Sequence, residues 1–341
     1  MLAMAFAKPG EVDVIESMDL PAPEPADDEV LVQVKACALN HLDIWVRRGL
    51  PMRIPMPHIS GCDVTGVVAK LGRTVAGFRE GQRVMIAPGL RCGHCEWCSR
   101  GEDSLCREFK ILGFQVQGGL AEFTKARAVD LIPISDAWSF AEWAAVPLVF
   151  LTAWHMLFSR AALRPGDDVL VHAAGSGVGS AAIQIAKLAG ARVFATAGSD
   201  AKLGLARDLG ADFAFNYRQS NFADEALKLT GNRGVDIVVE HIGESVWKDS
   251  LRALAPNGRL VTCGATSGPQ VSLDLRFFFM RQLTVTGAYM GGRHELLQVV
   301  KHVERRELRP VVDVVMPLRE TRAAQRRMEG REQFGKIVLE P

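Results

Sequence analysis

The sequence lacks an excess of charge of either sign. Its 341 residues include 40 lysines and arginines against 39 aspartates and glutamates, a formal net charge of +1. This balance leaves no electrostatic footprint for nucleic acid or for an anionic membrane surface. The sequence therefore predicts neither nucleic acid nor a membrane as a partner.

Long apolar runs are also missing. The most apolar window, Trp143 to Phe158, contains Pro147 and His155 and is too short to span a bilayer. The first residues show no basic segment followed by an apolar run, so no secretory signal is predicted. Internal repeats and low-complexity segments are absent. We expect a soluble cytoplasmic protein whose length suits two domains.

One stretch, Asp168 to Asp200, reads as strand, glycine-rich turn, helix and second strand. Apolar residues recur at helical spacing after the turn, and Gly190 closes the helix. Such a turn offers backbone N–H groups and a helix N-terminus to a pyrophosphate. We predict dinucleotide binding through Gly175, Ser176, Gly177, Val178 and Gly179. Ser176 stands where the fingerprint has its middle glycine, so either Gly177 restores the close approach or the Ser176 hydroxyl contacts phosphate.

The order of the elements predicts an α/β chain with two domains. Short strands with glycine turns near 3–7, 30–35, 64–68 and 83–86 indicate a small β-barrel-type domain. Six strands with helical spacers then predict a doubly wound parallel sheet, near 169–171, 192–196, 213–217, 235–239, 259–263 and 283–287. A last helix (295–304) and two strands (311–315 and 336–339) are expected to return to the first domain. The predicted boundaries are 1–150, 151–292 and 293–341, with the active site between the domains.

Four of the seven cysteines cluster in one loop. Cys92, Cys95, Cys98 and Cys106 follow the pattern C-x2-C-x2-C-x7-C, in a lobe of about residues 90–108. Four thiolates close a tetrahedral shell around Zn²⁺ and leave no open position, so the predicted zinc is structural. Two disulfides and an iron–sulfur cluster are the alternatives. The other three cysteines are interpreted as buried small hydrophobes, Cys62 with the least support.

Together these features resemble the medium-chain dehydrogenase/reductase superfamily along essentially the whole chain. The resemblance is carried by GCDVTGVV (61–68), the cysteine lobe, AAGSGVG (173–179), TGAYMGG (286–292) and FGKIVL (334–339). It implies a GroES-like catalytic domain, a Rossmann domain and hydride transfer from a nicotinamide. It also implies a homodimer or homotetramer, with a dimer-forming edge around 283–290.

The zinc-dependent alcohol dehydrogenases of this superfamily hold a second, catalytic zinc, and here the sequence departs from them. Asn40 stands where the first ligand cysteine would be, Cys62 replaces a histidine and Asp63 a glutamate. Leu148 stands near the third ligand position, and the proton-relay positions hold Leu42 and Trp45. A catalytic zinc needs three protein ligands and an open position, so we predict no catalytic metal.

Without a Lewis acid, only hydrogen bonds polarise the substrate, which favours quinones or the C=C bond of an enone. The Asn40…Asp43 pattern resembles the zinc-free quinone oxidoreductase branch, which usually lacks the cysteine lobe. We expect Asn40 to bind the acceptor oxygen or to be a turn residue, and His41 to relay a proton or to be an ordinary histidine. Asp43 is expected to orient His41 or to cap a helix. Thr152 resembles the threonine that packs against the nicotinamide.

An NAD enzyme has an acidic residue at the end of the second strand, and here that position is Ala197. Because Ala197 is neutral, a 2′-phosphate meets no electrostatic repulsion there. The residues expected to bind this phosphate are Ser199, Lys202, Tyr217 and Arg218. A solvated helix start at 199–202 is the alternative interpretation. The resemblance adds Gly264 and Lys336 to the expected coenzyme-binding residues.

We therefore expect an NADP(H)-dependent oxidoreductase with one structural zinc that reduces a quinone or an α,β-unsaturated carbonyl without a catalytic metal. NAD is the alternative coenzyme. The alternative functions are an alcohol or aldehyde dehydrogenase with an atypical site and a non-catalytic NADPH-binding protein.

Overall fold

The computed structural model describes residues 1–341, which form two compact units. The first unit comprises Met1–Leu148, Gly292–Val300 and Arg309–Pro341. The second comprises Val149–Gly291 and Lys301–Leu308. The segment Lys301–Leu308, which the sequence assigned to the returning tail, thus groups with the second unit.

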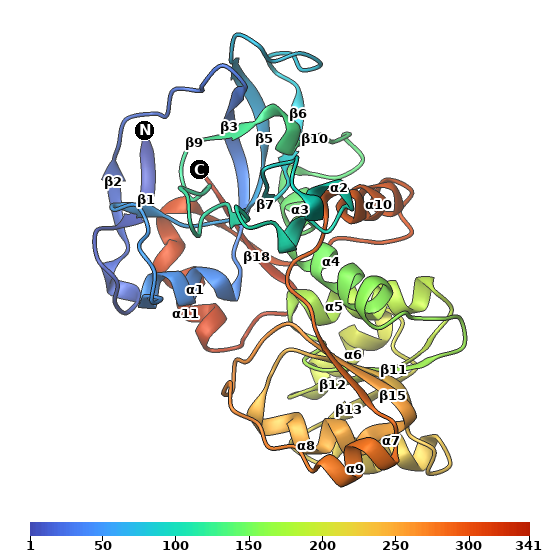
Figure 1. The fold of residues 1–341 in the computed structure, drawn as a ribbon. Helices are drawn as coiled ribbons and strands as arrows, with labels where there is room; N and C mark the ends of the chain where they lie inside the picture. The colour runs from blue at the N-terminus through green and yellow to red at the C-terminus, as the bar shows by residue number, and fades with distance from the viewer. The chain divides into compact units, whose positions relative to one another are not determined.

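The first unit is built on a seven-stranded sheet (Figure 1) with the order β10-β6-β5-β3-β18-β17, in which β9 also pairs with β3. The two strands of the C-terminal tail, β17 and β18, lie in this sheet. The strands are β3 (Glu29–Ala38), β5 (Asp63–Leu71), β6 (Arg83–Ile86), β9 (Phe123–Arg127), β10 (Leu131–Pro133), β17 (Val312–Pro317) and β18 (Lys336–Glu340).

Smaller sheets and helices complete this unit. One sheet has the order β2-β1-β4, and a two-stranded antiparallel sheet pairs β7 with β8. These strands are β1 (Leu2–Phe6), β2 (Glu16–Asp19), β4 (His58–Ile59), β7 (Gly89–Leu90) and β8 (Lys110–Ile111). The helices are α1 (His41–Arg48), α2 (Glu96–Ser99), α3 (Phe140–Ala144) and α11 (Thr321–Glu329), and α10 (Arg293–Glu304) begins here.

Alternation of side chains explains the central strand β3. Val30, Val32 and Val34 are buried, while the residues between them are half-buried, as expected where successive side chains point to opposite faces. Helix α3 packs on the end of this strand through small residues, since Ala141 and Ala144 form one cluster with Ala36, Ala38 and Val338. Small side chains allow the helix to approach the sheet closely.

The second unit is the doubly wound parallel sheet that the sequence predicted. Its order is β13-β12-β11-β14-β15-β16, and every neighbouring pair is parallel. The strands are β11 (Asp168–Val171), β12 (Arg192–Ala197), β13 (Phe213–Asn216), β14 (Val235–Glu240), β15 (Leu254–Thr262) and β16 (Thr284–Gly287). The helices are α4 (Pro147–Trp154), α5 (Gly177–Leu188), α6 (Asp200–Asp208), α7 (Phe222–Leu229), α8 (Glu244–Ala253) and α9 (Leu275–Met280).

Helices cover this sheet because its central strands are buried on both faces. All four residues of β11 are buried, as parallel strands between two helix layers require. Helices α5 and α6 pack on β12, and α8 packs on β14 and β15. Right-handed crossovers place α5 and α6 on one face and α7 and α8 on the other.

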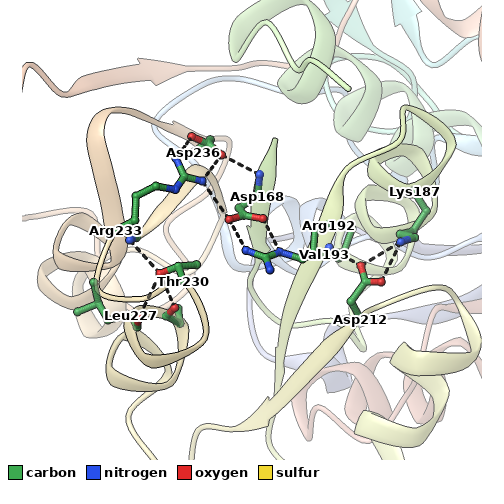
Figure 2. A network of polar contacts seen from close by, with 11 residues as sticks. Asp168, Lys187, Arg192, Val193, Asp212, Leu227, Thr230, Arg233 and Asp236 are labelled. Atoms are coloured by element: carbon green, nitrogen blue, oxygen red, sulfur yellow. Dashed lines mark hydrogen bonds and ion pairs between the residues drawn. The ribbon is translucent and has the colours of Figure 1, made fainter. Parts of the chain in front are cut away.

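An ion-pair network ties together the amino ends of the central strands (Figure 2). Asp168, the first residue of β11, binds Arg192 through both carboxylate oxygens at 2.7 Å and accepts from Arg233 at 3.0 Å. Arg233 also binds Asp236 of β14, and Asp212 binds Lys187 of α5. These charges lie at one edge of the sheet, which leaves the opposite, carboxyl edge for a ligand.

The window from Trp143 to Phe158 is helical and largely buried. It falls on α3, on α4 and on a π-helical turn (His155–Arg160) that follows α4 directly. None of the helices is long and apolar enough to cross a membrane.

Candidate functional site

The glycine-rich turn joins β11 to α5 at the carboxyl edge of the sheet. Ser176 is the N-cap of α5, and its Oγ accepts from the Gly179 amide at 2.9 Å. A Cβ on Gly179 would lie 2.3 Å from the Ala173 carbonyl oxygen, so only glycine permits this close packing of helix and turn. Gly177 and Val178 form the first turn of α5, where backbone amides are available to an anion. Together with Gly175, these residues fit a coenzyme pyrophosphate.

The Ser176 hydroxyl has a second contact that the sequence did not predict. His241, just after β14, places Nε2 3.1 Å from Ser176 Oγ. Gly264, just after β15, lies close to the same segment, because a Cβ there would be 3.0 Å from the His241 carbonyl oxygen. The ends of three adjacent strands therefore meet beside the turn.

A buried histidine lies directly under the turn. His172 Nε2 lies 2.8 Å from Ser250 Oγ, and Nδ1 lies 3.3 Å from Thr196 Oγ1. Since Ser250 Oγ donates to the Val246 carbonyl, it accepts from Nε2–H, which fixes the tautomer. Burial, with a smaller effect of His241, lowers the pKa of His172 to about 3, so the ring is neutral. No sequence motif indicated this network, because its members lie on three separate elements.

The residues predicted to select the coenzyme gather where β12 and β13 end. Ser199 caps α6 and accepts from the Lys202 amide at 3.4 Å. The Tyr217 hydroxyl covers Gly198, where a Cβ would lie 2.4 Å from it and 3.4 Å from Arg218 Nε. Ala197, the last residue of β12, is buried and uncharged. Asp200, also at this edge, accepts from Asn216 Nδ2 at 3.0 Å.

Strand register assembles a second polar group, in the first unit. Ala38 of β3 pairs with Val338 of β18 and with Asp63 of β5. Because β3 and β18 are antiparallel, continuing this register by two residues places Asn40 opposite Lys336. Three residues far apart in sequence therefore meet at the end of β3.

Hydrogen bonds join these residues into one buried cluster, which we call the Asn40 cluster: Asn40, Cys62, Asp63 and Lys336. Asn40 Nδ2 donates to Asp63 Oδ2 at 2.8 Å and to Cys62 Sγ at 3.2 Å. Lys336 Nζ donates to Asn40 Oδ1 at 2.5 Å and to Asp63 Oδ2 at 2.8 Å. The other Asp63 oxygen accepts from the Leu148 amide at 2.8 Å. The sequence named these residues separately but did not predict their connection.

Asp43 connects this cluster to helix α1. Its Oδ2 accepts a hydrogen bond from the backbone N–H of Asn40 at 2.7 Å, which caps the helix. Its Oδ1 accepts from the backbone N–H of Gly61 at 2.9 Å. Burial raises the pKa of Asp43 to about 6, although the two amides and Lys336 oppose the shift. His41, the first residue of α1, packs edge-on against Trp45 with ring centroids 5.3 Å apart. Burial, with smaller effects of Arg331 and Arg48, lowers the pKa of His41.

The Asn40 cluster is a poor shell for a catalytic metal. The Asp63 carboxylate already accepts hydrogen bonds from the Lys336 ammonium, the Asn40 side-chain amide and the Leu148 backbone N–H. The side chain of Leu148 offers no ligand atom. Burial raises the pKa of the Cys62 thiol well above its usual range, which disfavours the thiolate that zinc requires. The donor set therefore does not fit a catalytic zinc.

The cysteine lobe, by contrast, fits one ion closely. Sγ distances are 3.8 Å from Cys92 to Cys98, 3.5 Å from Cys95 to Cys98 and 3.6 Å from Cys106 to Cys92. A tetrahedron with Zn–S bonds of about 2.3 Å has edges of about 3.8 Å, whereas a disulfide is about 2.05 Å long. All four sulfurs lie within 4.8 Å of one another, as around a single centre. His94 is exposed, and its Nδ1 lies 3.1 Å from the Cys92 carbonyl oxygen.

The remaining predicted residue, Thr152, belongs to the second unit. It is buried within α4, with 5% of its surface exposed. Two residues further on, Trp154 stacks against Phe158 and His302, with ring centroids 4.5 and 5.4 Å apart.

Comparison with known proteins agrees with both units. Residues 26–136 match the family of alcohol dehydrogenase GroES-like domains, and residues 177–305 match that of zinc-binding dehydrogenases. A zinc-type alcohol dehydrogenase-like protein of Schizosaccharomyces pombe is 31% identical over 97% of this chain and 94% of its own length. The chain belongs to the medium-chain dehydrogenase/reductase superfamily.

Two further similarities come from different branches. A quinone oxidoreductase of Sus scrofa is 28% identical over 99% of this chain and 97% of its own length. The crystal structure of an NAD-dependent alcohol dehydrogenase is 46% identical, covers 100% of both chains and superposes with a TM-score of 0.97. This chain is thus an oxidoreductase with a GroES-like domain and a Rossmann-type parallel sheet.

Proposed function

We propose that this protein transfers hydride from NADPH to a quinone or an α,β-unsaturated carbonyl without a catalytic metal. The observation that carries the proposal is the Asn40 cluster, in which a lysine ammonium lies among the residues that replace the zinc ligands. An alcohol is oxidised with difficulty unless a Lewis acid stabilises its alkoxide. Quinones and enones accept hydride with hydrogen bonding alone.

The chain's own residues have distinct parts in this proposal. When bound, the reduced nicotinamide supplies the hydride. The first turn of α5 binds the pyrophosphate, and Thr152 packs against the nicotinamide. After hydride reaches the acceptor carbon, the resulting enolate or hydroquinone anion takes up a proton, which His41 delivers. The lowered pKa of His41 makes its protonated form a stronger acid.

Metal content together with a substrate panel tests this function. We expect one zinc per chain in the wild type, one in Cys62→Ser and none in Cys98→Ser, measured by elemental analysis. We also expect NADPH oxidation with quinones or enones and little turnover of alcohols. Two zinc ions in the wild type, one of them lost in Cys62→Ser, would instead establish an alcohol dehydrogenase. The 46% identical alcohol dehydrogenase structure favours that second candidate.

NADP(H) is the proposed coenzyme because Ala197 is uncharged and Tyr217, Arg218 and Ser199 lie together at the end of β12. The alternative coenzyme is NAD, because the 46% identical structure is named as an NAD-dependent alcohol dehydrogenase. Titration of tryptophan fluorescence should show tighter binding of NADPH than of NADH. Ala197→Asp should reverse this order, since its carboxylate repels a 2′-phosphate and binds a ribose hydroxyl. Tighter NADH binding by the wild type would overturn the assignment.

We also propose a homodimer formed through the second unit. Strand β16 ends the six-stranded sheet, so one of its edges is unpaired. Beside it in sequence, α9 exposes 66% of Leu275, 64% of Phe279 and 75% of Met280. An open strand edge next to exposed large apolar side chains is typical of an interface.

A further inference from the structure

The hydrogen-bonding capacity of Asn40 is largely used within the protein. A side-chain amide has two N–H donors, and both are committed, one to Asp63 Oδ2 and one to Cys62 Sγ. Its oxygen accepts from Lys336. For Asn40 to donate to a substrate oxygen, as the sequence predicted, one of these buried bonds would have to break. Its side chain is 6% exposed and its orientation is fixed on three sides.

Lys336, unlike Asn40, has more hydrogen-bond donors than the acceptors named around it. An ammonium has three donors, and the protein provides acceptors for two of them, Asn40 Oδ1 and Asp63 Oδ2. The residue is 3% exposed, so its charge is balanced within the protein and not by solvent. Two buried carboxylates surround it, Asp63 in direct contact and Asp43 at longer range.

Backbone hydrogen bonds hold the main chain of Lys336 in place. It is the first residue of β18, and its amide donates to the Val311 carbonyl at 2.9 Å. The neighbouring Ile337 carbonyl accepts from the Leu39 amide, which precedes Asn40. The strand that carries the ammonium is therefore bonded to the segment between β3 and α1 that carries Asn40.

We propose that Lys336 is the positioning residue of the reaction: its ammonium holds the Asn40 amide and the Asp63 carboxylate in place and supplies the positive charge of a site without a catalytic metal. This inference rests on the proposed function. It assigns Lys336 a role different from the coenzyme contact that the resemblance implied. If Lys336 is a positioning residue, its substitution changes the turnover. If it is a coenzyme contact, its substitution changes the affinity for coenzyme.

Lys336→Met separates these roles. We expect kcat for the preferred acceptor to fall at least tenfold, while the dissociation constant of NADPH, measured by fluorescence, stays within twofold. Lys70→Met, at an exposed lysine paired with Glu24 in the same unit, is the matched control and should change neither value. A Lys336→Met enzyme that binds NADPH more than tenfold more weakly but keeps its kcat at saturation would overturn the proposal.

Chemical rescue tests whether the charge itself is needed. Lys336→Ala leaves a cavity the length of a propylammonium ion, and added ethylammonium should restore part of the lost kcat. Propanol, neutral and of similar size, should not. The double variant Asn40→Ala, Lys336→Met should lose no more kcat than the more impaired single variant, because both substitutions break the same hydrogen bond between Lys336 and Asn40. Additive losses, or equal rescue by propanol, would contradict the positioning role.

Failure of the proposed function is distinguishable from failure of this inference. If the wild type oxidises alcohols and ignores quinones and enones, the proposed function fails, and the same variants are assayed with the alcohol. Urea unfolding of Asp63→Asn, Lys336→Met and the double variant measures the coupling of the pair without any substrate. Additive changes in the unfolding midpoints would show that the buried pair is not coupled and would overturn the inference.

Discussion

Two helical glycines of the second unit differ in the space that each leaves for a methyl group. Gly179 lies in the first turn of α5, where a Cβ would meet the Ala173 carbonyl oxygen at 2.3 Å. Gly204 lies inside α6, and a Cβ there would meet nothing within 4 Å. The same substitution is therefore expected to have opposite effects at the two positions.

Gly179→Ala should lower the free energy of unfolding by about 1–3 kcal/mol, because the turn must shift to admit the methyl group. It should also weaken coenzyme binding, since the amides of this turn move. Gly204→Ala should raise the free energy of unfolding by about 0.5–1 kcal/mol through helix propensity. Urea unfolding and fluorescence titration of both variants check this, and equal effects at the two sites would contradict it.

At this scale the sequence predicted identities better than connections. Asn40, Asp63 and Lys336 were each singled out by motif, but the bond from Lys336 to Asn40 spans 296 residues. Only the pairing of β3 with β18 brings the two together, and strand pairing is a property of the tertiary structure. The four cysteines were predicted more completely because one short loop contains all of them.

At the scale of elements, β11, β12 and α8 share the buried side chain of His172, and this connection is expected to depend on pH. The pKa of His172 is about 3 in the folded protein, against an ordinary value of 6.5. Below pH 6.5 the unfolded chain therefore binds a proton that the folded protein does not bind. Stability from this residue is complete above pH 6.5 and is lost as the pH falls.

Between pH 7 and pH 5 this loss should amount to about 2 kcal/mol. His172→Gln removes the titrating group, so the variant should lose about that much less than the wild type over the same range. Urea unfolding at both pH values measures the difference, in which the other titrating groups of the two proteins cancel. Parallel pH dependence of wild type and variant would show that folding does not lower the pKa of His172.

Two elements, α11 and β9, were missed in the sequence for the same reason. Helix α11 buries Thr321, Ala324, Gln325 and Met328, and strand β9 buries Thr124 and Ala126. Their buried faces consist mostly of small or polar residues, so hydrophobic periodicity does not reveal them. The strands of the parallel sheet were predicted because continuous apolar runs between glycine turns leave few alternatives.

At the scale of the whole molecule, the proposed dimer is tested by charge placed on α9. We expect the wild type to sediment at twice the monomer mass and Phe279→Asp or Met280→Asp to sediment as monomers, because a buried unpaired carboxylate opposes association. Val129→Asp, at a residue of the first unit that is 58% exposed, is the matched control and should remain dimeric. Analytical ultracentrifugation measures all four proteins, and a monomeric wild type would refute the proposal.

The place of β18 in the seven-stranded sheet has a consequence for biosynthesis. Its neighbours there are β3 and β17, so a strand that begins at Lys336 completes a sheet whose strand β3 begins at Glu29. While the chain emerges from the ribosome, most of the second unit is synthesised between two parts of the first, so the sheet of the first unit is complete only after Lys336–Glu340 has been translated. Until Lys336 is translated, the carboxylate of Asp63 has no ammonium beside it, and a chain that stops before Lys336 never acquires one.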